Sequence, residues 1–275
     1  MNILIPTDFS ENSWNAIQYS LAFFKEVNVV FHIVHVESST QEEESLEFSG
    51  NIAIDKKISV GEDKLKQLKE KIAKNFPLQS EQINFHIETG FLIETLRQIV
   101  NQLKITYIVM GTKGVSNNEK CLIGTNTADV IKRIQCPILV VPEKTKYKKP
   151  KQIVFPTDFS NFSKERVFRN LAEILHLNHS ALSVLYVAKK NDSLTAFQSS
   201  NKARLKEYIR YLPHSFQFTV KNSLCKALQE FINLEDIQMI ALPAKNVYLF
   251  QNLLFQPVEK NITYPKEIPF LVLHE

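Results

Sequence analysis

Residues 6–10 read Pro-Thr-Asp-Phe-Ser, and the same five letters return at residues 156–160. Each copy follows an apolar triplet, at residues 3–5 and 153–155, and precedes a stretch with helical spacing. Five consecutive identities at an offset of 150 residues are unlikely by chance. The chain therefore contains an internal repeat, and the repeat decides how the rest is interpreted.

The later parts of the two copies align at a different offset. Leu92 and Pro137 fall on Leu224 and Pro269, which lie 132 residues further along the chain. The second copy is therefore 18 residues shorter. We place the loss before residue 88, most simply in the polar, acidic stretch 37–55 and the helix that follows it.

A chain of 275 residues is longer than one compact core normally organises, which agrees with two units. We expect a domain at residues 1–142, a linker at 143–151 and a second domain at 152–275. The net charge of +4 is unevenly distributed: the linker holds five Lys against one Glu, the first domain 14 basic against 17 acidic side chains, and the second 14 against 11. Because the excess lies largely in a solvated hinge, we expect no nucleic-acid partner.

Within the first copy, short apolar runs alternate with stretches of helical spacing. The runs predict five strands, at residues 2–6, 27–36, 83–88, 105–110 and 138–141. Ser10 is placed to N-cap the first helix. This order predicts an α/β fold, a doubly wound parallel sheet with helices on both faces. In such sheets a ligand binds outside the carboxyl ends of the strands, where the winding reverses.

The loop after the fourth predicted strand carries the clearest chemical signal. It has the spacing Gly111-x2-Gly114-x9-Gly124-Thr125, and it follows a strand and opens a helix. Glycines let main-chain amides approach a polyanion without interference from a Cβ atom, and a helix start favours phosphate. The chain has six glycines, and three of them fall in these fourteen residues. We interpret the loop as a phosphate cradle, the alternative being three turn glycines on the surface.

The pentapeptide, the His35-Val36 pair, the glycine spacing and the ending at residues 136–142, Cys-Pro-Ile-Leu-Val-Val-Pro, resemble the universal stress protein family in its tandem two-domain form. The resemblance covers nearly the whole chain. It implies that each domain is a five-stranded parallel sheet in the order 3-2-1-4-5, and that ATP or a related adenine nucleotide binds, with Mg²⁺ able to bridge the phosphates.

The resemblance also implies a set of site residues and an assembly. The nucleotide would be bound by Pro6, Thr7, Asp8, Val36, Met110, Gly111, Thr112, Gly114, Gly124, Thr125 and Asn126. The last strands of the two domains, near residues 138–141 and 269–273, would pair antiparallel and form a pseudo-dimer within one chain. A homodimer of the whole chain stays open.

The second copy has lost the glycine loop. At the offset of 132, Gly111, Gly114, Gly124 and Thr125 become Pro243, Asn246, Gln256 and Pro257. Proline lacks an N–H, and the larger side chains fill the space that a phosphate needs. We therefore expect the second domain to keep the fold without binding ATP in this way, and Asp158 to act as a turn residue.

Several other classes of protein are disfavoured. No apolar run has the length of a membrane span, and the N-terminus shows no secretory signal, so we expect a cytoplasmic protein without a membrane partner. Three cysteines without a Cys-x-x-Cys pair are structural thiols. The seven histidines show no metal-ligand spacing, so no metal site is expected in the protein itself.

Three functions remain. The first is a nucleotide-binding module that regulates a stress response, with ATP in the first domain alone. The second is an adaptor that binds a protein partner through the degenerate domain, with no or incidental nucleotide. The third is a weak ATP hydrolase. It is the least supported, because we find no positioned base or arginine finger and assign no catalytic residue.

Overall fold

The computed structural model describes residues 1–37, 51–77, 80–112, 124–159, 165–188, 193–220, 224–244 and 268–274; for 51–60, 80 and 224–225 it describes the backbone alone. The first half contains β1 (Asn2–Pro6), α1 (Glu11–Phe23), β2 (Val30–Glu37), α3 (Asn51–Asn75), the 3-10 turn η1 (Ser80–Gln82), β3 (Ile83–Thr89), α4 (Leu92–Gln102), β4 (Tyr107–Gly111), α5 (Thr125–Arg133) and β5 (Ile138–Val141). The second half contains β6 (Gln152–Thr157), α6 (Glu165–Asn178), β7 (Ala181–Ala188), α7 (Ala196–Tyr208), β8 (His214–Val220), α8 (Leu224–Leu234), β9 (Met239–Pro243) and β10 (Phe270–Leu273).

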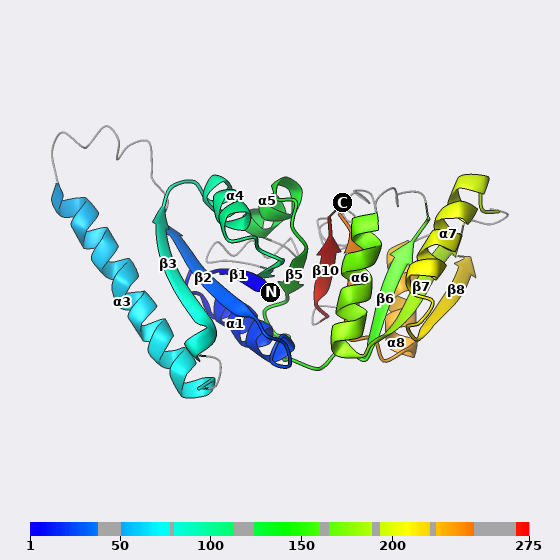
Figure 1. Cartoon of the computed structure of the whole chain (residues 1–275), viewed down its shortest axis with the longest axis horizontal. Coiled ribbons are helices and arrows are strands. Elements are labelled where there is room, and N and C mark those ends of the chain that lie inside the picture. The colour runs from blue at the N-terminus through cyan, green and yellow to red at the C-terminus, as the bar shows by residue number, and fades with distance from the viewer. Residues whose placement is uncertain are drawn as a thin grey trace.

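All ten strands form one sheet, in the order β3-β2-β1-β4-β5-β10-β9-β6-β7-β8. Within each half the strands are parallel, and the order 3-2-1-4-5 occurs twice. β5 and β10 meet antiparallel, with Leu139 opposite Leu271. The predicted fold and the pairing of the last strands are confirmed, and the two halves stand side by side in Figure 1.

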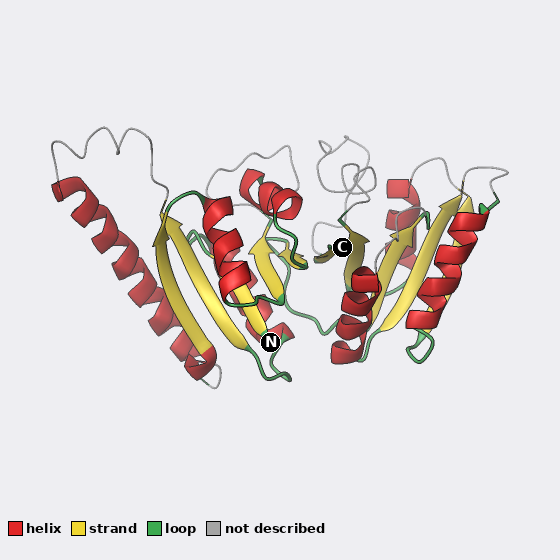
Figure 2. Ribbon diagram, turned by 45° about the horizontal axis from the view of Figure 1, so that its top comes forward, coloured by secondary structure: helices red, strands yellow, loops and turns green. Residues whose placement is uncertain are grey.

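Helices cover both faces of this sheet (Figure 2). One cluster of buried side chains includes residues of α1, α3, α6 and α7, and the other includes residues of α4, α5 and α8. Each cluster contains residues of both halves, so the core is continuous across the junction. No helix in the described ranges has both the length and the apolar character needed to cross a membrane.

The predicted element boundaries differ from the observed ones where a helix ends before a strand. β2 begins at Val30 because the Val27 N–H donates to the Phe24 carbonyl at 3.0 Å in the turn that ends α1. β4 begins at Tyr107 because the Ile105 N–H donates to the Val100 carbonyl at 3.0 Å and closes α4. Such carbonyls at a helix end need a donor, and the next residues supply it.

The difference in length between the halves lies between the second and third strands. α3 has 25 residues and its counterpart α7 has 13. This agrees with the predicted place of the deletion, although residues 38–50 lie outside the described ranges.

Candidate functional site

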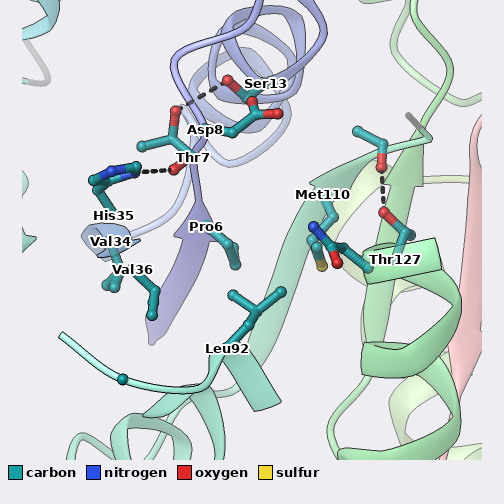
Figure 3. Close-up of a pocket in the computed structure, with 13 residues that line it drawn as sticks. Pro6, Thr7, Asp8, Ser13, Val34, His35, Val36, Leu92, Met110 and Thr127 are labelled. Carbon is teal, nitrogen blue, oxygen red and sulfur yellow. Dashed lines mark hydrogen bonds between the residues drawn. The ribbon is translucent and has the colours of Figure 1, made fainter. Parts of the chain in front are cut away.

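The carboxyl ends of β1, β2 and β4 surround a cavity of about 290 Å³. β1 lies between β2 and β4 in the sheet, and the helices that follow β1 and β3 cover opposite faces, so the cavity lies where the winding reverses. Its lining residues come from both sides of this point, as Figure 3 shows: Pro6, Thr7, Asp8, Ser13, Val34, His35, Val36, Gly90, Leu92, Met110, Gly111, Asn126 and Thr127.

A network of hydrogen bonds fixes the turn between β1 and α1. Ser10 is the N-cap of α1, as predicted, and its Oγ accepts from the Ser13 N–H at 3.2 Å. Asp8 Oδ1 accepts from the N–H and the hydroxyl of Ser10, at 3.1 and 2.6 Å. The Ser13 hydroxyl donates to the Ser10 carbonyl at 2.9 Å, so the Thr7 hydroxyl is the donor in its 3.0 Å bond with Ser13. These hydrogen bonds hold the turn between β1 and α1 in one conformation.

The same turn occurs in both halves, which explains the repeated pentapeptide. Phe9 and Phe159 have φ angles of +62° and +57°, a conformation that a bulky side chain rarely adopts. In each case the Phe N–H donates to the hydroxyl of the preceding Thr, at 3.1 Å to Thr7 and 2.8 Å to Thr157. The second half keeps this turn without the glycine loop, so the pentapeptide has a structural role in both halves.

His35, at the end of β2, joins two walls of the cavity. Its Nδ1 lies 2.8 Å from the Thr7 carbonyl oxygen (Figure 3). A carbonyl oxygen only accepts, so Nδ1 carries the proton and Nε2 carries the lone pair when the ring is neutral. The Phe9 ring lies against the imidazole, with centroids 4.4 Å apart. His35 therefore holds the β1–α1 turn against β2.

Gly111 ends β4, and the packing around it explains why it has no side chain. A Cβ atom at this position would lie 2.7 Å from Asn12 Oδ1, 2.8 Å from Cγ and 2.9 Å from Nδ2. Asn12 belongs to α1 and is buried. The missing side chain leaves room for Asn12, and because Gly111 also lines the cavity, its contact with a nucleotide stays a prediction.

The start of α5 forms the opposite wall. Gly124 is its N-cap, with φ −71° and ψ 162° and no side-chain cap. Asn126 and Thr127 line the cavity, and the Thr127 hydroxyl donates to the Gly111 carbonyl at 2.8 Å. α5 is thereby attached to the end of β4.

The structure brings seven of the eleven predicted site residues to the cavity: Pro6, Thr7, Asp8, Val36, Met110, Gly111 and Asn126. Thr112 is buried beside it, with its N–H bonded to the Val141 carbonyl at 3.1 Å. Gly124 and Thr125 precede Asn126 but are not among the lining residues. Gly114 lies outside the described residues.

Six residues that line the cavity were not predicted as site residues: Ser13, Val34, His35, Gly90, Leu92 and Thr127. Gly90 and Leu92 follow β3, and the rule that ligands bind at carboxyl ends could have found them. Gly90 has a φ of +149°, which a residue with a side chain adopts only under strain. Ser13 and Thr127 each lie one helical turn inside a predicted helix, where the sequence offers no signal that distinguishes them.

The second half differs at the equivalent positions. Pro243 lies opposite Leu273 in the sheet, as Gly111 lies opposite Val141, which confirms the alignment at this point. In place of His35, β7 carries Tyr186, whose ring stacks on Phe159 with centroids 5.5 Å apart. The other replacements, Asn246, Gln256 and Pro257, lie outside the described residues, as does the apolar stretch 248–255.

The described chain holds little else that suggests chemistry. Cys136 is buried, and burial raises the pKa of its thiol to about 12, so this cysteine is structural, as predicted. The Cys121 and Cys225 side chains lie outside the described part. Where side chains are described, no group of three His, Cys, Asp or Glu residues could hold a metal ion. The cavity is lined by one carboxylate, one imidazole, three hydroxyl groups and one side-chain amide.

Comparison with known proteins gives concordant results. The model of the universal stress protein family matches residues 1–142. Two universal stress proteins of Methanocaldococcus jannaschii are similar: one is 28% identical over 153 residues (52% of this chain and 94% of that protein), the other 30% identical over 151 residues (54% and 83%). The crystal structure of a universal stress protein from Archaeoglobus fulgidus aligns with 100% of this chain and 96% of its own, with a TM-score of 0.69 and 17% identity, so it shares the fold along both halves.

Proposed function

Because the chain belongs to the universal stress protein family, we propose that its first half binds ATP or a related adenine nucleotide in the cavity at the carboxyl ends of β1, β2 and β4. The observation that carries this proposal is that seven of the residues implied by the resemblance line one cavity, at the point where the winding of the sheet reverses. Its volume of about 290 Å³ is close to the lower end of small-molecule sites.

The lining offers a suitable group for each part of a nucleotide. Val36, Leu92 and Met110 form the apolar wall against which a flat base would pack. Asp8 is exposed, and its carboxylate would accept hydrogen bonds from ribose hydroxyls. The phosphates would extend toward the start of α5, where main-chain N–H groups and the helix dipole favour negative charge. Mg²⁺ would be bound mainly through phosphate oxygens, because Asp8 is the one carboxylate among the described lining residues.

We infer a binding module rather than an enzyme. The protein would act in the cytoplasm as a regulatory component of a stress response, and occupancy of the cavity would be the signal. The second half would not bind nucleotide in this way. Pro243 in place of Gly111 and Tyr186 in place of His35 support this part of the proposal.

A matched pair of variants at Gly124 tests the proposed position of the phosphates. The backbone angles at Gly124 suit any residue, and Asp and Asn are about equally good N-caps, so neither substitution should destabilise α5. Gly124→Asp places a negative charge beside the phosphates, and its isostere Gly124→Asn does not. We expect Asp to raise the Kd for ATP about tenfold or more and Asn to change it less than about threefold.

The readout is a calorimetric titration with ATP and Mg²⁺, preceded by extraction of any nucleotide that copurifies with the chain. Gly114→Asp is a second variant with the same expected loss. Equal affinity of the Asp and Asn variants would place the phosphates elsewhere. A wild-type chain with no bound nucleotide and no heat of binding would refute the proposal and favour the adaptor function.

A further inference from the structure

The last carbonyl groups of a helix have no partner within the helix, and at the end of α5 two of them accept from side chains that are distant in sequence. The Val130 carbonyl accepts from the Ile134 N–H at 3.0 Å. The Ile131 carbonyl accepts from Nε2 of His274 at 2.8 Å, and the Arg133 carbonyl from Nη2 of Arg97 at 3.3 Å. Only the first of these bonds is local.

His274 follows β10 and belongs to the second half. It lies 143 positions from Ile131 in sequence and is buried, with 7% of its surface exposed. Because the Ile131 carbonyl can only accept, Nε2 carries the proton. Burial, together with the charge of Arg166, lowers the pKa of His274, so the ring is a neutral donor near pH 7.

A second side chain from the same half reaches this region. Arg166, in α6, donates from Nη2 to the Gln135 carbonyl at 3.4 Å, just beyond the end of α5. Donors and positive charge at the carboxyl end of a helix are favourable because they neutralise its dipole. The second half therefore supplies both a buried donor and a cation to the end of a helix in the first half.

The other end of α5 is the cavity wall. Asn126 and Thr127 line the cavity, and the Thr127 hydroxyl bonds to the Gly111 carbonyl at 2.8 Å. α5 has nine residues, too few to be stable without caps and packing. Asn126 and Thr127 lie about two helical turns from the carboxyl end of α5, so a loss of helical order at that end would extend to them.

From this arrangement we propose that the second half acts as a built-in cap for α5 and thereby sets the affinity of the first-half cavity, with His274 as the positioning residue. The inference rests on the proposed function for its ligand and adds the regulation of that site. The second half, which in the proposed function binds no nucleotide, would then stabilise the nucleotide site of the first half. By linkage, a nucleotide that orders α5 strengthens the contact between the halves by the same factor.

Other contacts between the halves do not involve α5 and provide a control. Tyr107, in β4, donates to Glu173 of α6 at 3.0 Å, and β5 pairs with β10. Removing the Tyr107 hydroxyl weakens the junction without touching the end of α5. If general loosening of the junction were sufficient, Tyr107→Phe and His274→Ala would have the same effect on the cavity.

The experiment compares His274→Ala with His214→Ala in the full chain. His214 also bonds a carbonyl, that of Leu212 at 2.8 Å, but it lies in β8 at the far edge of the sheet. A third variant, His274→Gln, restores an N–H donor at about the reach of Nε2. The first readout is amide hydrogen exchange of α5 without ligand, and the second is the Kd for ATP with Mg²⁺.

We expect His274→Ala to speed exchange in α5 and to raise the Kd, each by about fivefold, the usual effect of one lost buried hydrogen bond. His274→Gln should recover most of both effects, and His214→Ala should show neither. If His274→Ala does not fold, Arg166→Gln gives the same test with smaller changes.

Unchanged exchange in α5 would overturn the capping role, and faster exchange with unchanged Kd would overturn its coupling to the cavity. Equal effects of Tyr107→Phe and His274→Ala would also overturn it. A wild-type chain that binds no ATP refutes the proposed function instead, and the exchange measurements then still decide whether the second half caps α5.

Discussion

Gly111→Ala is a sharp test of the site geometry, because the structure gives a specific reason for this glycine. The added Cβ would lie 2.7, 2.8 and 2.9 Å from three side-chain atoms of Asn12. All three distances are shorter than ordinary contacts, and Asn12 is buried with 6% of its surface exposed, so it has little room to move. Overpacking of this kind costs about 1–3 kcal/mol of the free energy of unfolding.

The assay is urea denaturation of four chains: wild type, Gly111→Ala, Asn12→Ala and the double variant. In the Asn12→Ala background the clashing atoms are gone, so the cost of Gly111→Ala should fall to about 0.5 kcal/mol or less, which gives a coupling energy of at least about 0.5 kcal/mol. Gly111→Ala should also weaken ATP binding, because the residue lines the cavity. The same cost in both backgrounds would refute the reasoning, since Asn12 would then not be the obstacle.

Three further predictions concern the turn, the junction and pH. Ser10→Ala removes the side-chain cap of α1 and the hydrogen bond from the Ser10 hydroxyl to Asp8 Oδ1; we expect a loss of about 1 kcal/mol in urea denaturation, and an unchanged midpoint would count against the capping role. Tyr107→Phe removes the bond to Glu173; we expect a similar loss, with hydrogen exchange in α5 unchanged. Burial lowers the pKa of His274 from its ordinary 6.5, so below about pH 6.5 the unfolded chain binds a proton that the folded chain does not, and stability falls. The His274→Gln chain should lose less stability than wild type between about pH 7.5 and about pH 5.5, and equal slopes would contradict the assignment.

Much of the fold could be predicted from local pattern. The alternation of apolar runs with helical spacing gave the elements of the first half, and the repeated pentapeptide gave the second copy. The predicted starts of two strands were wrong by a few residues, and these strands begin at Val30 and Tyr107. The residues just before them instead form hydrogen bonds with the end of the preceding helix. The local sequence does not reveal whether a residue in such a turn belongs to the end of the helix or to the start of the strand.

The site was predicted less completely, because its remaining features depend on contacts between distant residues. A glycine spacing suggests main chain near a phosphate, and nothing in the sequence reveals that Asn12 occupies the space beside Gly111. The bond from His35 to the Thr7 carbonyl depends on the register between β1 and β2. The bond from His274 to Ile131 depends on the antiparallel pairing of two strands from different halves.

The repeat also shows how one turn can serve two purposes. Both halves keep the Thr hydroxyl that holds a phenylalanine at positive φ. In the first half the turn also borders an open cavity, while in the second half Gln198 and Asn201 of α7 donate to the carbonyls of Asp158 and Phe159, each at 2.8 Å. The turn therefore has a structural role in both halves, and in the first half it also borders a cavity.

The central claim is that the first half binds an adenine nucleotide and the second does not. The most direct measurement is the stoichiometry of ATP binding to the full chain by calorimetry, with wild type and Gly124→Asp compared. The account predicts one ATP per chain for wild type and a Kd raised about tenfold or more in Gly124→Asp. Two ATP per chain, or one that the variant retains at full affinity, would contradict it.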